Sequence, residues 1–223
     1  MHIQKYTRSA VGHILKHNEP SKARSRRENV DNSRTNQNYA FVGGHGSKNL
    51  KKVLGSDNVY VNPRKDVNVL CSVCLTAPSD LPKTREKEFF ELSFRFLQER
   101  YKCPCVSCWV HYDEMSRYEG RTEQIRPHMH FAFVPLVYDE KKSRFKVNAK
   151  TVVCLSDLQT LHQDFDKFIQ DNMGIKLAVL NGATENGNKS ILELKNQSLK
   201  DDIKKLKKLK NQVVSEIQQE LSR

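Results

Sequence analysis

The pattern of apolar and polar positions predicts strands and helices along most of the chain. Apolar runs and alternating apolar residues predict strands over residues 67–76, 105–111 and 128–137. Apolar residues spaced by threes and fours predict long helices over residues 84–101 and 156–173. Shorter segments complete the pattern, namely helices over 10–17 and 47–54, strands over 2–6, 144–148 and 175–180, and an apolar run over 39–42.

The links between these elements decide the fold class. The turn at Asp139–Lys142 is too short for a crossover connection, so it favours antiparallel pairing. We therefore predict an α+β fold, in which helices pack on one face of an antiparallel sheet. Ser9 and Ser156 are the expected N-caps of their helices, and residues 115–126 are expected to form a polar, charged loop.

The end of the chain has a different character from the rest. Residues 1–187 are predicted to form the folded domain, and residues 188–223 a Lys-rich helix. Apolar residues in this helix recur at threes and fours, as at the start of a coiled coil that would join two copies of the chain. A solvated helix that leans on the body fits the same pattern. The positions concerned are Leu199, Ile203, Leu206, Val213, Ile217 and Leu221.

The balance of charge points to a polyanionic partner. The chain carries 38 Lys and Arg against 26 Asp and Glu, for a net charge of +12. This surplus lies before residue 70 and after residue 188, while residues 71–187 are balanced, so the two ends are suited to hold phosphate. No stretch approaches the roughly 18 apolar residues of a membrane span, and no secretory signal is evident, so we expect a cytoplasmic protein.

The six cysteines allow two interpretations. Cys71 and Cys74 have a spacing that zinc sites use, and Cys103, Cys105 and Cys108 are available as further ligands. Cys71 and Cys74 also lie inside an apolar run typical of a buried strand, where small buried cysteines are ordinary. The second interpretation is favoured. The sixth cysteine, Cys154, belongs to neither group.

Three histidines and an acid pair form the most informative segment. His128 and His130 are two residues apart on a predicted strand, so both imidazoles project from one face. His111 ends the preceding strand and is followed by Asp113 and Glu114. Three neutral imidazoles that converge on a sheet face can hold a metal ion, and a nearby carboxylate can orient an imidazole or take a proton. Ordinary polar positions remain the alternative.

A second cluster lies near the N-terminus. His17 ends the first predicted helix and leads into an Arg-rich loop, which is followed by Tyr39. His17 and Tyr39 are candidate nucleophiles, and the arginines and amides between them are candidate phosphate contacts. A basic loop with a tyrosine is common, so this cluster alone carries little weight.

Three motifs in order resemble one known family. The segments Lys16-His17-Asn18-Glu19, Ser33-Arg34-Thr35-Asn36-Gln37-Asn38-Tyr39 and His111-Tyr-Asp113-Glu114 … Pro127-His128-Met129-His130 resemble motifs of the MobV (Mob/Pre) plasmid mobilisation relaxases. The resemblance extends over roughly residues 1–190. This family belongs to the HUH endonucleases, whose antiparallel sheet backed by helices agrees with the fold class predicted above.

The resemblance implies a bacterial, metal-dependent enzyme that nicks and rejoins one DNA strand at a plasmid transfer origin. It implies that His111, His128 and His130 hold a divalent ion, Mn²⁺ or Mg²⁺. It gives His17 the role of the nucleophile that forms a covalent 5′-phosphoryl-histidine, with Tyr39 as the alternative nucleophile. Glu114 becomes the candidate base toward His17.

The same resemblance and the basic loops give a set of expected DNA contacts. Arg34 matches the arginine of the second motif, and the other positions lie in the Arg-rich loop before it, at Asn38, or in the long segment before Pro127. The full set is Arg24, Arg26, Arg27, Arg34, Asn38, Arg117, Arg121 and Arg126.

Three departures from the family pattern leave other functions open. Pro20 and Asn36 stand where the family commonly has Arg and His, and the segment between Glu114 and Pro127 is longer than usual. A catalytically weak or inactive DNA-binding, regulatory protein on the same fold is therefore one alternative. A rolling-circle replication initiator is another, although the predicted helix over residues 156–173 lacks the tyrosine that such enzymes use.

Overall fold

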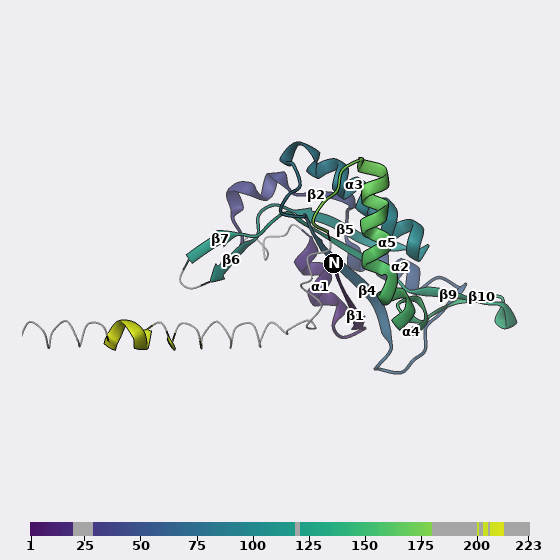
Figure 1. Cartoon of the computed structure of the whole chain (residues 1–223). Coiled ribbons are helices and arrows are strands. Elements are labelled where there is room, and N and C mark those ends of the chain that lie inside the picture. Colours follow the sequence, from purple (N-terminus) through teal and green to yellow (C-terminus); the bar gives the residue numbers. More distant parts are fainter. Residues whose placement is uncertain (20–28, 119–120, 180–199, 201–202, 205, 212–223) are drawn as a thin grey trace, which may run out of the picture. The chain divides into compact units, whose positions relative to one another are not determined.

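The computed structural model describes residues 1–19, 29–118, 121–179, 200, 203–204 and 206–211 (Figure 1). These residues divide into two compact units. The larger unit comprises residues 1–115 and 124–181, and it contains every predicted site residue that the structure describes in full. The smaller unit comprises residues 116–123 and 182–223.

A five-stranded sheet forms the centre of the larger unit. Its order is β1 (His2–Thr7), β4 (Asn68–Thr76), β8 (His128–Phe133), β5 (Cys105–His111) and β2 (Tyr39–Val42). Each neighbouring pair is antiparallel, in agreement with the predicted sheet. All six residues of β8 are buried, because this strand is paired on both sides and covered on both faces.

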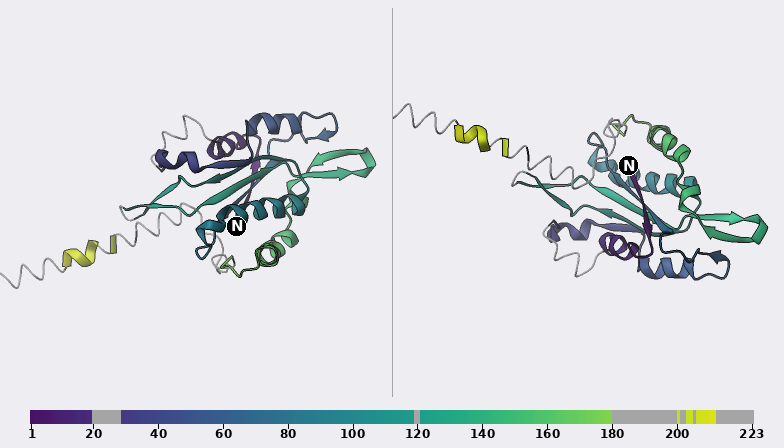
Figure 2. Two further views of the ribbon diagram at one scale, coloured as in Figure 1. Left: turned by 90° about the horizontal axis from the view of Figure 1, so that it is seen from above. Right: turned by 90° about the horizontal axis from the view of Figure 1, so that it is seen from below.

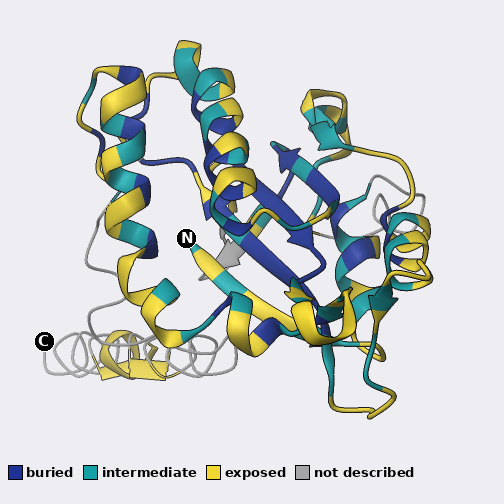
Figure 3. Ribbon diagram, turned by 90° about the vertical axis from the view of Figure 1, so that its right-hand side faces the viewer, coloured by how far each residue is buried: buried dark blue, intermediate teal, exposed yellow. Residues whose placement is uncertain are grey.

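One face of the sheet is sealed by a helical layer made of α3 (Glu86–Tyr101) and α5 (Leu155–Met173), with α4 (Ala149–Val152) before α5 (Figure 2). Met129, Phe131 and Phe133 project from β8 into this layer and are fully buried. Figure 3 shows the buried residues concentrated on the central strands and on the inner sides of the helices. The residues of α3 and α5 that share this core with the apolar side chains of β8 are Phe89, Phe90, Leu97, Leu161, Phe165 and Ile169.

The opposite face carries a second, smaller layer. The helices α1 (Val11–Asn18) and α2 (Gly46–Leu54) lie on this side, as Figure 2 shows. Leu15 and Leu50 pack there against Ala132 of β8 and other apolar residues. The α+β class with an antiparallel sheet is therefore confirmed, and its helices cover one face fully and part of the other.

A three-stranded sheet extends one end of this unit. It contains β3 (Val59–Tyr60), β10 (Arg144–Val147) and β9 (Leu136–Asp139), with β10 in the middle. The expected single strand over residues 128–137 was wrong, since it is divided into β8 and β9. Pro135 has no backbone N–H and cannot continue the ladder, so the chain changes sheets at this point.

The expected loop over residues 115–126 was also wrong. It forms two paired strands, β6 (Met115–Tyr118) and β7 (Arg121–Gln124). Tyr118 and Thr122 favour extended backbone, and this preference outweighed the charged composition. In the smaller unit, residues 200, 203–204 and 206–211 are helical, while the rest of the predicted C-terminal helix lies outside the described residues.

The remaining differences concern short segments. Residues 175–179 are not the expected strand, and residue 180 lies outside the described residues. The helix α5 ends just before this segment, at Gly174 in the left-handed conformation (φ 66°). Ala10 and Cys154, rather than Ser9 and Ser156, occupy the N-cap positions. In the described part of the chain, the 3₁₀ helices η1 (Asn32–Gln37) and η3 (Glu140–Lys142) were not predicted, and η2 (Lys83–Arg85) forms the first turn of the long helix predicted to end at residue 101.

Two further expectations concern cysteines and membranes. All six cysteines are free, and Cys71 is buried in the core, as the strand interpretation predicted for it. Cys74, to which the same interpretation applied, is only partly buried, and Cys108 is buried as well. Among the described residues, the group that could hold a metal ion contains no cysteine. In the same part of the chain, no helix has the length and apolar character needed to cross a membrane.

Candidate metal and nucleophile site

Two neighbouring strands bring three imidazoles together at one end of the central sheet. His128 and His130 lie on one face of β8, and His111 at the end of β5 is the cross-strand partner of His128. The ring centroids are 5.0 Å apart for His128 and His130, 5.1 Å for His111 and His130, and 5.5 Å for His111 and His128. We call these three residues the histidine cluster. Each of them is at most 7% exposed.

Backbone carbonyl groups fix the orientation of two rings. The Nε2 atom of His111 lies 2.9 Å from the carbonyl oxygen of Asn18, and Nδ1 of His128 lies 3.2 Å from the carbonyl oxygen of Arg126. These contacts turn the other nitrogen of each ring, Nδ1 of His111 and Nε2 of His128, into the site. Such a carbonyl partner on the far nitrogen is typical of metal-binding histidines.

His130 has the clearest character of a ligand. Its Nε2 atom is buried and has no hydrogen-bond partner among the described residues. Burial lowers the pKa of His130 well below its usual value, and the neighbouring His111 and His128 act in the same direction. A buried, neutral imidazole with an unused nitrogen is expensive unless something binds that nitrogen.

Glu114 links the cluster to His17. Its Oε1 atom lies 3.3 Å from Nε2 of His17 and 3.3 Å from Nδ1 of His111, and its Oε2 atom lies 3.3 Å from Nε2 of His128. Burial alone would raise the pKa of Glu114, but hydrogen bonds from His111 and His128 outweigh burial and hold this pKa far below its usual value. Glu114 is therefore a carboxylate surrounded by imidazoles.

The last turn of α1 delivers His17 to this site. Leu15, which is 1% exposed, anchors α1 on the sheet. The Glu19 carboxylate then accepts a hydrogen bond from the backbone N–H of Gly46 at the start of α2. The His17 ring stands edge-on to His130 at 5.2 Å and to His111 at 6.0 Å. Its side chain is 21% exposed, more than any ring of the cluster.

The most compact group of donor atoms differs from the predicted triad. One ligand atom each from His17, His111, Glu114 and His130 lies within 4.8 Å of the others. Atoms bound to one ion at about 2.0–2.3 Å lie roughly 3–3.5 Å from one another, so a small inward movement would complete such a site. His128 contacts the second oxygen of Glu114 beside this group. The structure thus brings all five predicted residues together.

Tyr39, the alternative nucleophile, lies on the other face of the sheet. Its cross-strand partner is Val110, which faces the α3 layer, and its ring packs at 5.5 Å from Phe41 and 6.4 Å from Tyr112. The hydroxyl group is buried and has no hydrogen-bond partner among the described residues. Burial, followed by the effect of Tyr112, raises the pKa of Tyr39, so deprotonation is harder than usual.

The predicted DNA contacts have different outcomes. Arg34, on η1, donates hydrogen bonds to Gln124 and Gln37, and Arg126 donates to the carbonyl of Ala77 at 3.0 Å. Asn38 has a structural contact, since its Oδ1 atom accepts from the backbone N–H of Tyr112 at 2.7 Å. Arg24, Arg26 and Arg27 lie outside the described residues, as do the side chains of Arg117 and Arg121.

Sequence reasoning missed the way Asp113 is used. Asp113 is fully buried, and its carboxylate accepts a hydrogen bond from Thr35 at 2.9 Å. Its carbonyl accepts a second bond from the backbone N–H of Asp31 at 2.8 Å. These contacts tie η1 and Arg34 to the end of β5. The Asn18 carbonyl that orients His111 was also missed, because a backbone contact leaves no signal in residue type.

Comparisons with known proteins identify relatives of this chain. The family model for plasmid recombination enzymes (Mob_Pre) matches residues 1–178. A plasmid recombination enzyme of Bacillus thuringiensis is 30% identical over 173 residues, which cover 74% of this chain and 35% of that protein. A plasmid recombination enzyme type 2 of Staphylococcus aureus is 24% identical over 164 residues, or 70% of this chain and 37% of that protein. The chain therefore spans little more than a third of the length of these relatives.

Solved structures show the same fold. The MobM relaxase domain bound to plasmid pMV158 oriT DNA, in a Mn-bound crystal structure at pH 4.6, has a TM-score of 0.65 and 23% identity, and covers 87% of this chain and 97% of its own. A second Mn-bound MobM structure, with oriT DNA that carries a 3′ thiophosphate, has a TM-score of 0.64 and 21% identity, over 88% and 96% of the two chains.

Proposed function

Because this chain belongs to the Mob_Pre family of plasmid recombination enzymes, we propose that it nicks and rejoins one DNA strand at a plasmid transfer origin with the help of a divalent metal ion. One observation carries the proposal above all others. A partly exposed histidine, His17, stands beside three buried histidines and shares the carboxylate of Glu114 with two of them. This arrangement pairs a nucleophile with a place for a phosphate-polarising ion.

The histidine cluster fits a metal ion. His111, His128 and His130 would hold it, because two of their rings are oriented by carbonyl groups and the third has a buried nitrogen without a partner among the described residues. Mn²⁺ suits three nitrogen ligands better than Mg²⁺, which prefers oxygen. When bound, such an ion polarises a phosphate and offsets its negative charge.

In the proposed reaction, His17 attacks the scissile phosphorus. The nitrogen–phosphorus bond forms while the bond from phosphorus to the 3′ oxygen breaks, and that oxygen leaves with the electron pair and takes a proton from solvent. The 5′ end stays on the enzyme as a phosphoryl-histidine. Glu114 faces Nε2 of His17, so it keeps the proton on this nitrogen and offsets the positive charge that develops on the ring. Reversal of these steps rejoins the strand.

Basic side chains would hold the DNA for this step. The MobM domains that share this fold are bound to oriT DNA, and a net charge of +12 suits the same class of partner. Arg34 and Arg126 are the proposed contacts in the described part of the larger unit. Arg24, Arg26, Arg27, Arg117 and Arg121 remain predicted contacts, as do the boundary at residue 187, dimerisation through residues 188–223 and a place in the bacterial cytoplasm.

A covalent-capture experiment tests this function without knowledge of the origin. The chain is incubated with a randomised single-stranded DNA library and MnCl₂, and complexes that survive SDS are isolated and sequenced. We expect a subset of sequences to be captured with Mn²⁺ and none with EDTA. DNA binding without any captured or nicked strand would instead support the non-enzymatic DNA-binding alternative.

A further inference from the structure

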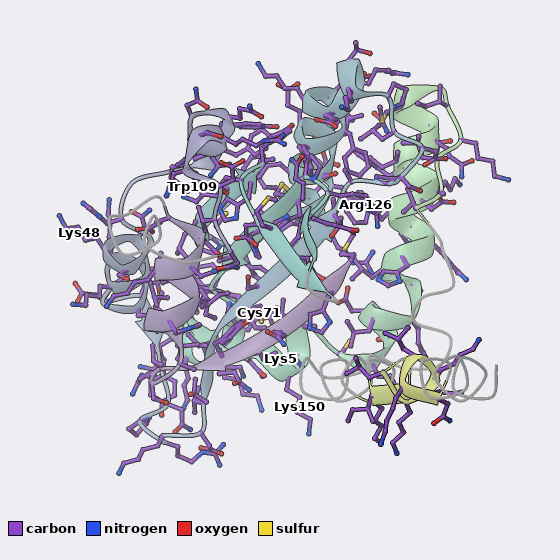
Figure 4. The ribbon with its side chains drawn as sticks, turned by 90° about the vertical axis from the view of Figure 1, so that its left-hand side faces the viewer. Lys5, Lys48, Cys71, Trp109, Arg126 and Lys150 are labelled. Carbon is purple, nitrogen blue, oxygen red and sulfur yellow. The ribbon has the colours of Figure 1, made fainter. Side chains whose placement is uncertain are left out.

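A cavity of about 390 Å³ lies beside the histidine cluster, and neither the proposed metal ligands nor His17 line it. It is formed where η1, η2, the start of α3 and the segment before β8 meet. Figure 4 places Arg126, one of its lining residues, toward the side of α5 and Trp109 toward α1 and α2. Its volume falls within the range of about 300–1,000 Å³ that is typical of small-molecule sites.

The lining of this cavity is cationic. Arg34, Lys83 and Arg126 contribute three positive charges, against one carboxylate, Glu86. The Nε atom of Arg34 is buried without a hydrogen-bond partner among the described residues. An anionic group would satisfy this donor and balance the local charge.

The cavity also has the groups that recognise a nucleobase. Tyr112 supplies an aromatic ring, which is the common stacking partner of an unpaired base. Gln37 supplies an amide whose NH₂ group can donate to the edge of a base, whereas the amide of Gln124 is used within the protein by Arg34 and by the carbonyl of Tyr112. Cations for a phosphate, an aromatic ring and an amide for a base are the three parts of a nucleotide site.

Backbone contacts join this cavity to the histidine cluster. Tyr112 directly follows His111, and the N–H of Ile125 donates to the carbonyl of Glu114 at 2.9 Å. Arg126, whose carbonyl orients His128, is a residue of the cavity wall. The cavity residues Tyr112 and Arg126 therefore lie one and two residues along the chain from His111 and His128 of the cluster.

We propose that this cavity binds one nucleotide of the DNA strand next to the scissile phosphate, with its phosphate on Arg34, Lys83 and Arg126 and its base against Tyr112. Gln37 then determines which base is accepted at that position. The inference rests on the proposed function, and it assigns part of the choice of target sequence to residues outside the catalytic group.

The test compares four proteins in the capture experiment, namely wild type, Gln37→Ala, Lys83→Ala and Lys87→Ala. Lys87 is exposed on the same helical segment but does not line the cavity, so it is the matched control. We expect Gln37→Ala to lose the base preference at one position beside the nick and to keep the others. Lys83→Ala should reduce capture about tenfold at limiting DNA, and Lys87→Ala should equal wild type. An unchanged preference in Gln37→Ala would overturn the proposal.

A binding measurement separates this inference from the proposed function. Filter binding of the unselected library at rising salt needs no nicking. The binding constant falls as the salt concentration rises, and loss of one phosphate contact makes the slope of log K against log salt concentration less steep by about 0.7 for single strands. We expect this decrease for Lys83→Ala and not for Lys87→Ala, whether or not wild type forms covalent complexes. Equal slopes for the two variants would reject the cavity as a nucleotide site.

Discussion

The two faces of the central sheet are built from the same strands and serve different purposes. On the α3 and α5 side, Met129, Phe131 and Phe133 are fully buried in a continuous apolar core. On the α1 and α2 side, Ala132 continues an apolar layer, but His128 and His130 occupy the other positions of β8. Because side chains alternate along a strand, neighbouring residues of β8 belong to different groups. One group stabilises the fold, and the other is the group for which we propose a chemical role.

The largest change in stability should come from a substitution on the apolar face. Phe131→Ala removes a fully buried ring from the core, and we expect it to lower the free energy of unfolding by about 3–5 kcal/mol. Chemical denaturation followed by circular dichroism measures the change. A loss below about 1 kcal/mol would mean that this face is not the main source of stability.

The neighbouring residue should behave differently. We expect His130→Ala to fold, since it removes a buried imidazole whose Nε2 has no partner among the described residues, and to lose the stabilisation that Mn²⁺ gives. In the wild type, Mn²⁺ binding should raise the free energy of unfolding by about 2.7 kcal/mol at a free Mn²⁺ concentration of 100 times Kd. Thermal unfolding with and without Mn²⁺ measures it, and His13→Ala, an exposed position on α1, is the control. A Mn²⁺ response in His130→Ala equal to that of wild type would remove His130 from the site.

A smaller effect is expected for Tyr39, which belongs to the stabilising face. Tyr39→Phe removes a buried hydroxyl without a partner among the described residues, so stability should change by less than about 1 kcal/mol. The variant should also retain the covalent complex with DNA, because the ring lies on the face opposite His17. Loss of the complex at unchanged stability would show that a residue of the apolar face takes part in chemistry.

The smallest effect concerns two arginines that lie outside the described residues. Replacing Arg26 and Arg27 by Glu should weaken binding to all single-stranded sequences alike and lower the salt slope by about 1.4 for two lost phosphate contacts. Filter binding of mixed sequences measures both quantities. If the slope is unchanged, the Arg-rich loop has a role in folding rather than in DNA contact.

The sequence predicted the alternation that separates the two faces, because the period of two is local and strong in β5 and β8. It also predicted that His111, His128 and His130 would meet, since strand ends pair in an antiparallel sheet. The position of His17 beside them could not be derived from periodicity. It depends on the packing of Leu15 and on the contact of Glu19 with Gly46, and both are tertiary contacts.

Other features could not be predicted from the local sequence pattern either. The charged composition of residues 115–126 hid the strands β6 and β7. The division of residues 128–137 at Pro135 depends on which sheet the chain joins next, which no local pattern records. The cavity beside Tyr112 is assembled from four separate segments, so its members give no common signal in the sequence.

The central claim is that His17 is the nucleophile and that the histidine cluster, without it, holds the metal. The direct measurement is covalent capture of DNA together with Mn²⁺ binding, both made on His17→Ala and on wild type. We predict that the wild-type complex is acid-labile and alkali-stable, as a phosphoramidate is. His17→Ala should form no complex but should keep its Mn²⁺ affinity and DNA binding. A complex that persists in His17→Ala, or a loss of Mn²⁺ binding in that variant, would contradict this assignment.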